Sequence, residues 1–276
     1  LLKLRKVINF SIFEGCDEFT SWEKHRREYL RTLGHELLIC NENDIFQIFD
    51  SWERQIHDLI KVDKNYNYFN ALLIISLLHY FNRSYDQIKE YIPFLTKILE
   101  SKNRKLICSA IATLRYLSEE SPENIDFLRD IVARYARKWI TTTSTRYSAL
   151  KLLLISGKFL LPTVFEVTSS SFQVLWASVI CDDVEVRTVA AKVVSIHLSG
   201  LPKSYVSDAN LIFKDCITQM KLLNTTSHGP ILVCRYLLYN YPEEIDVPLL
   251  INCLFDLFTV KSEVIIVAVS SLLYEI

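Results

Sequence analysis

Glycine, proline and methionine are all scarce in this sequence. Its 276 residues include five glycines, seven prolines and one methionine. Average usage would give about 19 glycines and about 14 prolines in a chain of this length. Sheet-rich domains, doubly wound nucleotide-binding folds and (β/α)8 barrels need glycine at their tight turns and phosphate-binding loops. The composition therefore argues against these classes and favours long helices joined by short turns.

An excess of charge is also missing. The chain has 31 Lys and Arg residues against 32 Asp and Glu residues, a formal net charge of −1. No global electrostatic field would draw it to nucleic acid, so we expect no nucleic-acid partner. The longest apolar runs, residues 71–78 and 264–273, contain serines. Because a membrane span needs roughly 18 to 20 apolar residues, we expect no membrane span.

The seven cysteines form no metal-binding pattern. No CxxC pair occurs, the cysteine count is odd, and consecutive cysteines are at least 18 residues apart. Cysteines in apolar helical surroundings behave as small hydrophobic residues, so we expect reduced structural thiols. This predicts an intracellular, cytoplasmic location, with any association with endomembrane surfaces made through partners.

The ends of the sequence suggest a piece of a longer protein. The first residue is Leu1, the only methionine is Met220, and the chain stops at Ile276 just after an apolar run. No targeting signal can be read without the true N-terminus. We therefore expect a fragment of a longer chain.

From residue 43 onward, apolar helical segments alternate with short polar breaks. Residues 44–61 place Ile45, Phe49, Trp52, Ile56 and Leu59 at steps of three and four, with polar residues on the other face. This pattern is typical of an amphipathic helix. Residues 66–81 are apolar nearly all round, which predicts a helix covered on more than one side. Continued along the chain, the alternation predicts helix pairs near residues 44–82, 84–118, 122–160, 162–198, 205–240 and 247–276.

The pairs recur at a nearly constant period. The second helices are predicted to start near Tyr66, Arg104, Thr145, Asp183, Ser227 and Glu263, at steps of 38, 41, 38, 44 and 36 residues. A helix pair of about 40 to 47 residues indicates the HEAT or armadillo class. Prolines agree with this period, because Pro122, Pro162, Pro202 and Pro242 are spaced by 40 residues where first helices are expected to begin. The predicted fold is all-α, an α-α superhelix of about six helix pairs.

The first 43 residues are less regular than the rest. Residues 18–39 are predicted to form a helix with Trp22, Tyr29, Leu33 and Leu37 on one face. No linker or low-complexity tract divides the chain. We therefore expect a degenerate N-terminal helical segment over residues 1–43 and one elongated solenoid over residues 44–276.

The clearest second helix begins after Asp182 and Asp183. Either aspartate can cap the free amide groups of the helix start. A polar stripe follows at steps of three and four, formed by Glu185, Thr188, Lys192, Ser195 and Ser199. The remaining surface is apolar, with Val186, Ala190, Val193 and Val194, and is expected to pack against its partner helix and neighbouring repeats.

Four residues of this helix and its preceding turn resemble the HEAT consensus: Asp182, Val186, Arg187 and Ala190. In that family the aspartate and arginine commonly help to tie adjacent repeats together. The resemblance therefore implies that these four residues are structural.

No group of residues completes a motif for chemistry. His35 and Glu36 begin a helical zinc motif, but Ile39 stands where its second histidine is needed. Gly157 and Lys158 lack the earlier glycine and the following hydroxyl residue of a phosphate loop. We therefore expect no catalytic, cofactor-binding or metal-binding residue in this chain.

The consecutive repeats resemble the N-terminal HEAT region of TOR-type protein kinases, over roughly residues 44–238. The matching segments are residues 71–78, 92–95, 133–140, 146–150, 165–172, 176–194, 212–223 and 229–238. Their order and spacing carry the resemblance. The short segment between residues 194 and 205 and the irregular residues 1–40 depart from the family's pattern.

The resemblance implies a parent serine/threonine kinase of the phosphatidylinositol-3-kinase-related group, acting in nutrient and growth signalling. Its ATP, magnesium and catalytic residues would lie C-terminal to this piece, so no catalytic residue is carried over. In the family, this solenoid contacts a regulatory scaffold subunit and contributes to a homodimeric complex.

Two alternatives remain open. The chain could be the HEAT or armadillo scaffold of a non-kinase protein, such as a transport receptor, an adaptor or a phosphatase regulatory subunit. A nucleic-acid-binding solenoid is disfavoured by the balanced charge. The leading hypothesis is a protein-interaction scaffold that presents an extended surface to protein partners.

Overall fold

A computed structural model describes residues 24, 26–28, 30–32, 42–80, 89–120, 125–164, 169–200 and 206–276. Every regular element in these residues is a helix, so the predicted all-α fold is confirmed. The chain divides into two compact units, residues 1–128 and residues 129–276. The predicted helix over residues 18–39 and the positions of Pro122 and Pro202 lie largely or wholly outside the described residues.

The first unit contains α3 (Glu42–Lys61), α4 (Asn65–Tyr80), α6 (Ile92–Glu100) and α7 (Arg104–Glu120). Helix α3 packs against α4, α4 against α7, and α6 against α7. Phe49, Trp52 and Ile56 are buried, as the amphipathic pattern of α3 predicts. Residues 68–78 of α4 are all buried, because α3 and α7 both cover this helix. The prediction of a helix covered on more than one side is confirmed.

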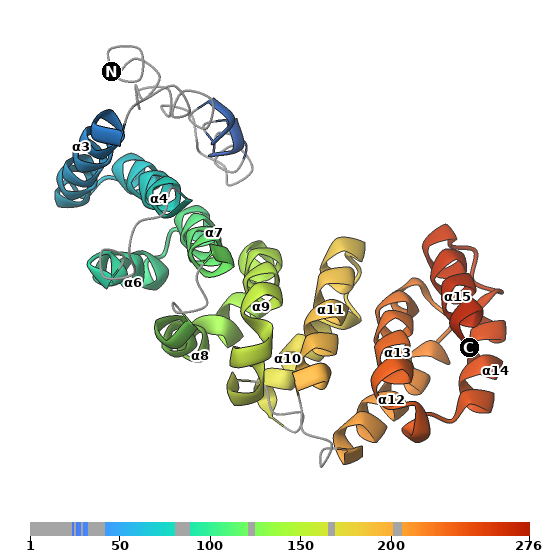
Figure 1. Ribbon diagram of the computed structural model, residues 1–276. Coiled ribbons are helices and arrows are strands. Elements are labelled where there is room, and N and C mark those ends of the chain that lie inside the picture. The colour runs from blue at the N-terminus through green and yellow to red at the C-terminus, as the bar shows by residue number, and fades with distance from the viewer. Residues whose placement is uncertain are drawn as a thin grey trace. The chain divides into compact units, whose positions relative to one another are not determined.

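The second unit begins within α8 (Ile125–Thr141), because the division between the units falls in this helix. It contains α9 (Thr143–Val164), α10 (Ser170–Val179), α11 (Val184–Gly200), α12 (Val206–Met220), α13 (His228–Asn240), α14 (Val247–Leu257) and α15 (Glu263–Glu275). The second helices form a row in which α9 packs against α11, α11 against α13, and α13 against α15 (Figure 1). Helices α10, α12 and α14 each pack against the second helix that follows. This is the helix-pair arrangement of an α-α superhelix.

The helix starts are capped by the short polar residues that precede them. Asp183 caps α11, its carboxylate accepting from the amides of Glu185 at 2.9 Å and Val186 at 3.1 Å. Asn103 caps α7 in the same way, and Asp246 caps α14. Of the two candidate caps for α11, Asp183 performs this role, whereas Asp182 stands one residue too early.

An arginine at the fourth position of a second helix recurs in two consecutive pairs. Arg146 of α9 donates from Nε to the carbonyl oxygen of Ile140 at 2.8 Å. Arg187 of α11 donates to the carbonyl oxygens of Cys181 at 2.7 Å and Asp182 at 2.8 Å. The last carbonyl groups of a helix have no intrahelical donor. Each arginine therefore donates to carbonyl groups at the end of the preceding first helix or in the turn after it. The repeat is therefore visible in hydrogen bonding as well as in helix spacing.

Two positions differ from the sequence expectations. Pro162 lies within the last turn of α9, which extends to Val164, instead of at the start of α10. A proline near a helix end removes a single backbone donor, and the helix stops two residues later. Ser195 is buried, although it belongs to the predicted polar stripe of α11. Its hydroxyl donates to the carbonyl oxygen of Ala191 at 2.6 Å, so burial leaves no unsatisfied group.

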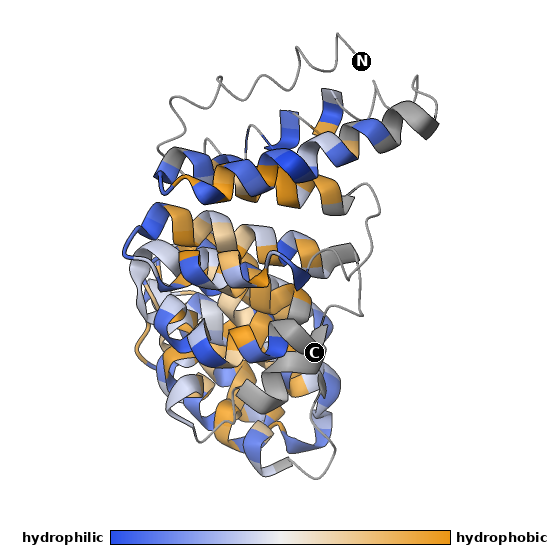
Figure 2. Ribbon diagram, turned by 90° about the vertical axis from the view of Figure 1, so that its left-hand side faces the viewer, coloured by the Kyte–Doolittle hydropathy of each residue, from blue (hydrophilic) through white to orange (hydrophobic). Residues whose placement is uncertain are grey.

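Hydrophobic and hydrophilic residues alternate within single helices, as Figure 2 shows by colour. In α11, Val186, Ala190, Val193 and Val194 are buried, whereas Lys192 is exposed. The predicted apolar face of this helix is therefore confirmed. No helix in the described ranges is both long enough and apolar enough to cross a membrane.

Candidate functional site

The four residues that resemble the HEAT consensus lie together at the turn between α10 and α11. Val186 and Ala190 are buried in the core, and the Arg187 side chain is 2 % exposed. Asp182 is exposed and contributes its backbone carbonyl to Arg187. The hydrogen bonds of Arg187 thus stay within its own helix pair.

A close junction links this turn to the next pair. Gly229, in the first turn of α13, lies so near the carbonyl of Val179 that a Cβ on the glycine would stand 1.9 Å from that oxygen. His228 beside it is buried, and the burial, together with the charge of Arg187, lowers the pKa of its imidazole. Arg187 therefore lies near enough to the next pair for its charge to contribute to the lowered pKa of His228, while Gly229 permits the contact between the two backbones.

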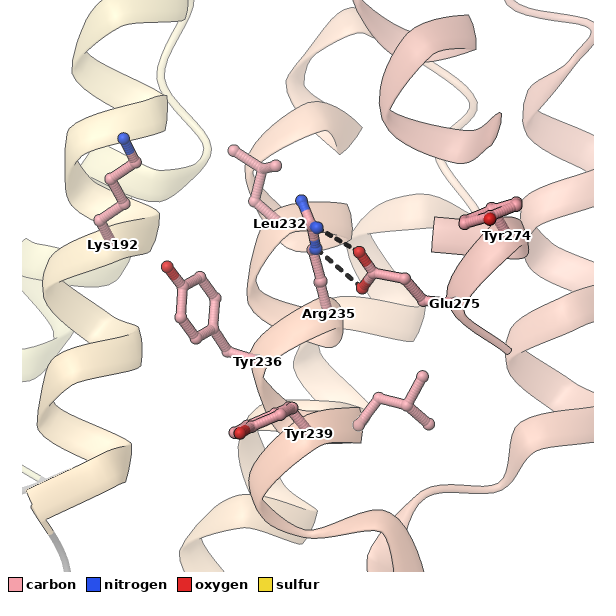
Figure 3. Close-up of a pocket in the computed structure, with 8 residues that line it drawn as sticks. Lys192, Leu232, Arg235, Tyr236, Tyr239, Tyr274 and Glu275 are labelled. Carbon is pink, nitrogen blue, oxygen red and sulfur yellow. Dashed lines mark hydrogen bonds and ion pairs between the residues drawn. The ribbon is translucent and has the colours of Figure 1, made fainter. Parts of the chain in front are cut away.

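A groove of different character runs along the row of second helices. Its cavity of about 880 Å³ is lined by Lys192 of α11, Leu232, Arg235, Tyr236, Leu238 and Tyr239 of α13, and Tyr274 and Glu275 of α15. Figure 3 shows these side chains arriving from three neighbouring helices. We call this cavity the tyrosine groove.

The three tyrosines of the groove are exposed. Tyr236 is 38 % exposed, Tyr239 is 86 % exposed and Tyr274 is 93 % exposed. Tyr236 and Tyr239 are three residues apart, so they share a face of α13, whereas Val233, Cys234 and Leu237 are buried in the core. The tyrosine hydroxyls make no hydrogen bond within the described part of the chain, which leaves them available to a ligand.

One ion pair crosses the groove. Arg235 of α13 donates from Nε to Glu275 of α15 at 2.8 Å, and a second bond joins its terminal nitrogen to the other carboxylate oxygen. This two-pronged pair links α13 to the last turn of α15. Lys192 of α11 is exposed and forms no ion pair with any residue that the structure describes. It is therefore the available cation of the groove.

A smaller hollow adjoins the tyrosine groove between α13 and α15. It has a volume of about 400 Å³ and shares Leu232 and Arg235 with the groove. Its remaining lining is His228, Glu263, Val264, Val267, Ala268 and Ser271. Because Val267 is 62 % exposed, the hollow adds apolar surface beside the tyrosine groove.

The lining of the tyrosine groove offers both apolar surface and polar groups to a ligand. It contains aromatic and aliphatic surface, hydroxyl groups, one available ammonium group and one closed ion pair. Histidine and cysteine are absent from this lining. Across the described residues, no group of three His, Cys, Asp or Glu side chains could hold a metal ion.

Sequence reasoning did not identify the groove residues. Tyrosines at helical spacing are usually interpreted as core, because the same pattern places apolar residues on a buried face. One feature of the sequence does indicate the groove: Arg235 and Glu275 are separated by 40 residues, which is the length of one repeat. That separation places opposite charges on neighbouring second helices.

Comparison with known proteins adds no family to this description. No protein-family model matches the chain, and no curated protein matches it. The basis for a function is therefore the geometry and chemistry of the groove.

Proposed function

We propose that this chain is a helical scaffold that binds protein partners through the tyrosine groove. The observation that carries the proposal is the convergence of Tyr236, Tyr239 and Tyr274 from two helices around one open cavity. Tyrosine offers a large, rigid contact area and a hydroxyl group at a low cost in side-chain entropy, and it is enriched at binding hot spots. Repeat proteins use such surfaces along their rows of helices.

A protein segment fits this groove better than a small molecule. Pockets for small ligands bury most of the ligand's surface. Here the ring of Tyr239 is almost fully exposed, so a small ligand would leave most of this ring in water. A peptide lying across α11 and α13 would cover it.

For the parent protein, we propose the N-terminal HEAT region of a TOR-type serine/threonine kinase. The consecutive matches over residues 44–238 support this proposal, and the helix pairs are compatible with it. ATP and magnesium would then belong to the parent's kinase domain, and a regulatory scaffold subunit and a second copy of the parent would be the partners in the cytoplasm. A coding sequence that continues into a FAT region and kinase lobes would support this proposal. A continuation without them would favour the non-kinase scaffold.

The binding role can be tested by photo-crosslinking in cells. A photoreactive phenylalanine analogue replaces Tyr239 in one variant of the full-length protein and Leu211 in a control variant. Leu211 is 43 % exposed on α12, in the other row of helices. We expect a discrete protein crosslink from position 239 that Tyr236→Ala and Tyr274→Ala weaken. Equal crosslinking from positions 211 and 239 would contradict the proposal.

A further inference from the structure

We propose that the tyrosine groove selects a protein segment in which a carboxylate side chain stands beside an apolar one. This inference rests on the proposed binding function and adds the chemistry of the partner. It follows from which charges of the groove are already paired and which are available.

The two cations of the groove differ in whether they already have a carboxylate partner. Both carboxylate oxygens of Glu275 accept from Arg235, so this pair is closed. Lys192 has no such partner among the described residues. In Figure 3 it extends from α11 on the side toward which Tyr236 of α13 points. An incoming carboxylate would thus find one ammonium group that needs no prior bond to be broken.

The hydroxyl group of Tyr236 adds a neutral donor on the same side of the groove as Lys192. The hydroxyl of Tyr236 makes no hydrogen bond to any described residue and lies on the Lys192 side of α13. A carboxylate placed between the two side chains would accept two charge-assisted hydrogen bonds, which are stronger than neutral ones. A basic side chain would meet Lys192 and find no unpaired carboxylate in the lining of the tyrosine groove.

The carboxylate of the adjoining hollow does not reverse this preference. Glu263 lines the smaller hollow in the first turn of α15. Helix α13 stands between α15 and α11, which carries Lys192. A carboxylate bound at the α11 side therefore meets Lys192 first.

Apolar surface lies beside the proposed carboxylate position, along α13. Leu232 and Leu238 flank the tyrosines along α13, and Val267 extends this surface toward α15. A leucine-sized or aromatic side chain next to the bound carboxylate would cover these groups. Burial of this apolar side chain would provide affinity, and Lys192 would make the groove selective for a negative charge.

The test uses the full chain and three fluorescein-labelled libraries of twelve-residue peptides. The libraries share randomised flanks and a central leucine, which is bordered by Glu in one, by Gln in the second and by Lys in the third. Binding is measured by fluorescence anisotropy at low and high salt. We expect the Glu library to bind about tenfold more tightly than the Gln library, with a preference that weakens as salt rises.

Two variants separate the charge from the groove itself. Lys192→Met should abolish the preference for Glu over Gln and leave binding of the Gln library unchanged. Tyr239→Ala should weaken the binding of the Glu library and of the Gln library to the same extent. Both variants should keep the wild-type melting temperature. Equal binding of the Glu and Gln libraries would overturn the carboxylate preference while the binding function stands. If none of the libraries binds at millimolar concentration, both proposals fail.

Discussion

The carbonyl oxygen of Val179 occupies the space that a side chain on Gly229 would need. A Cβ at position 229 would approach that oxygen to 1.9 Å, far inside any normal contact. Val179 ends α10 and Gly229 lies in the first turn of α13, so the contact joins two consecutive helix pairs. Glycine is required here because two backbones approach each other closely.

Replacing this glycine should loosen the junction. We expect Gly229→Ala to lower the free energy of unfolding by on the order of 3 kcal/mol, because the backbone must move to admit the methyl group. Urea denaturation followed by circular dichroism measures the change. Ser270→Ala, at an exposed position of α15, is the control and should stay within about 0.5 kcal/mol of the wild type. An unchanged midpoint for Gly229→Ala would show that the two backbones are not in contact.

The arginine of the turn between α10 and α11 should matter through its hydrogen bonds. Arg187→Met keeps much of the aliphatic volume but removes the donors to Cys181 and Asp182. We expect a loss of about 2 kcal/mol in the free energy of unfolding. Lys192→Met makes a similar change at an exposed position of the same helix and should cost less than about 0.5 kcal/mol. Equal effects of the two variants in thermal melts would argue against this role for Arg187.

A buried carboxylate in α11 should be much more costly than an exposed one. Val186 is 8 % exposed and faces the core, whereas Val184 is 40 % exposed at the helix start. Val186→Asp would bury an unpaired charge, and we expect a loss of several kcal/mol. Val184→Asp should be nearly neutral, since an acidic residue suits the N-terminus of a helix. A melting temperature for Val186→Asp as high as that of Val184→Asp would refute the packing described for α11.

The stability of the second unit should fall as the pH is lowered from 6.5 to 4. His197 is buried beside Phe172, and burial lowers the pKa of its imidazole from 6.5 to about 4. Between these values the unfolded chain binds a proton that the folded protein excludes, so stability is full above pH 6.5 and is lost below it. The contribution is at most about 3 kcal/mol. Burial lowers the pKa of His228 as well, which acts in the same direction.

The variant His197→Leu isolates this effect. Urea denaturation at pH 7.5 and pH 5.0 should show a smaller difference between the two pH values for the variant than for the wild type. Burial raises the pKa values of Asp208 and Asp215, which act in the opposite sense, but these groups are present in both proteins. Identical pH dependence in the two proteins would exclude His197 as the source.

The cysteines should differ widely in their rate of alkylation. Cys216 of α12 and Cys234 of α13 are fully buried, and burial and their mutual contact raise the pKa of the Cys216 thiol. Cys181 lies partly exposed in the turn before α11. Because the thiolate is the reactive form, we expect iodoacetamide to modify Cys181 at least about 100-fold faster than Cys216. Peptide mapping by mass spectrometry measures both rates, and similar rates in the native protein would contradict the burial of Cys216.

The helices and their period could be predicted because the signals are local. The apolar residues of α3 recur every three or four positions, and Asp183 caps α11 through amides two and three residues away. The predicted start of α15 at Glu263 coincides with the observed one, and that of α13 at Ser227 is one residue early. Such patterns depend on neighbours in the chain, which the sequence shows directly.

Other assignments needed the positions of distant residues. Ser195 belongs to a polar stripe by spacing but is buried, and the hydroxyl of Tyr241 donates to the carbonyl of Leu198, 43 residues away. Pro162 matches the proline period but lies within α9. For Ser195 and Tyr241 the outcome depends on the neighbouring helices, and for Pro162 it depends on how far α9 continues past the proline. Spacing along one helix contains neither kind of information.

By itself, the sequence determined an all-helical chain of recurring pairs, since scarce glycine, apolar periodicity and capping residues act within a few turns of one helix. Only the tertiary structure decided which apolar and aromatic residues stay uncovered. Tyr236 and Leu237 are adjacent in α13, yet the first faces the tyrosine groove and the second is buried in the core. Packing α11, α13 and α15 side by side creates that difference, because burial is a property of neighbouring helices and not of one residue.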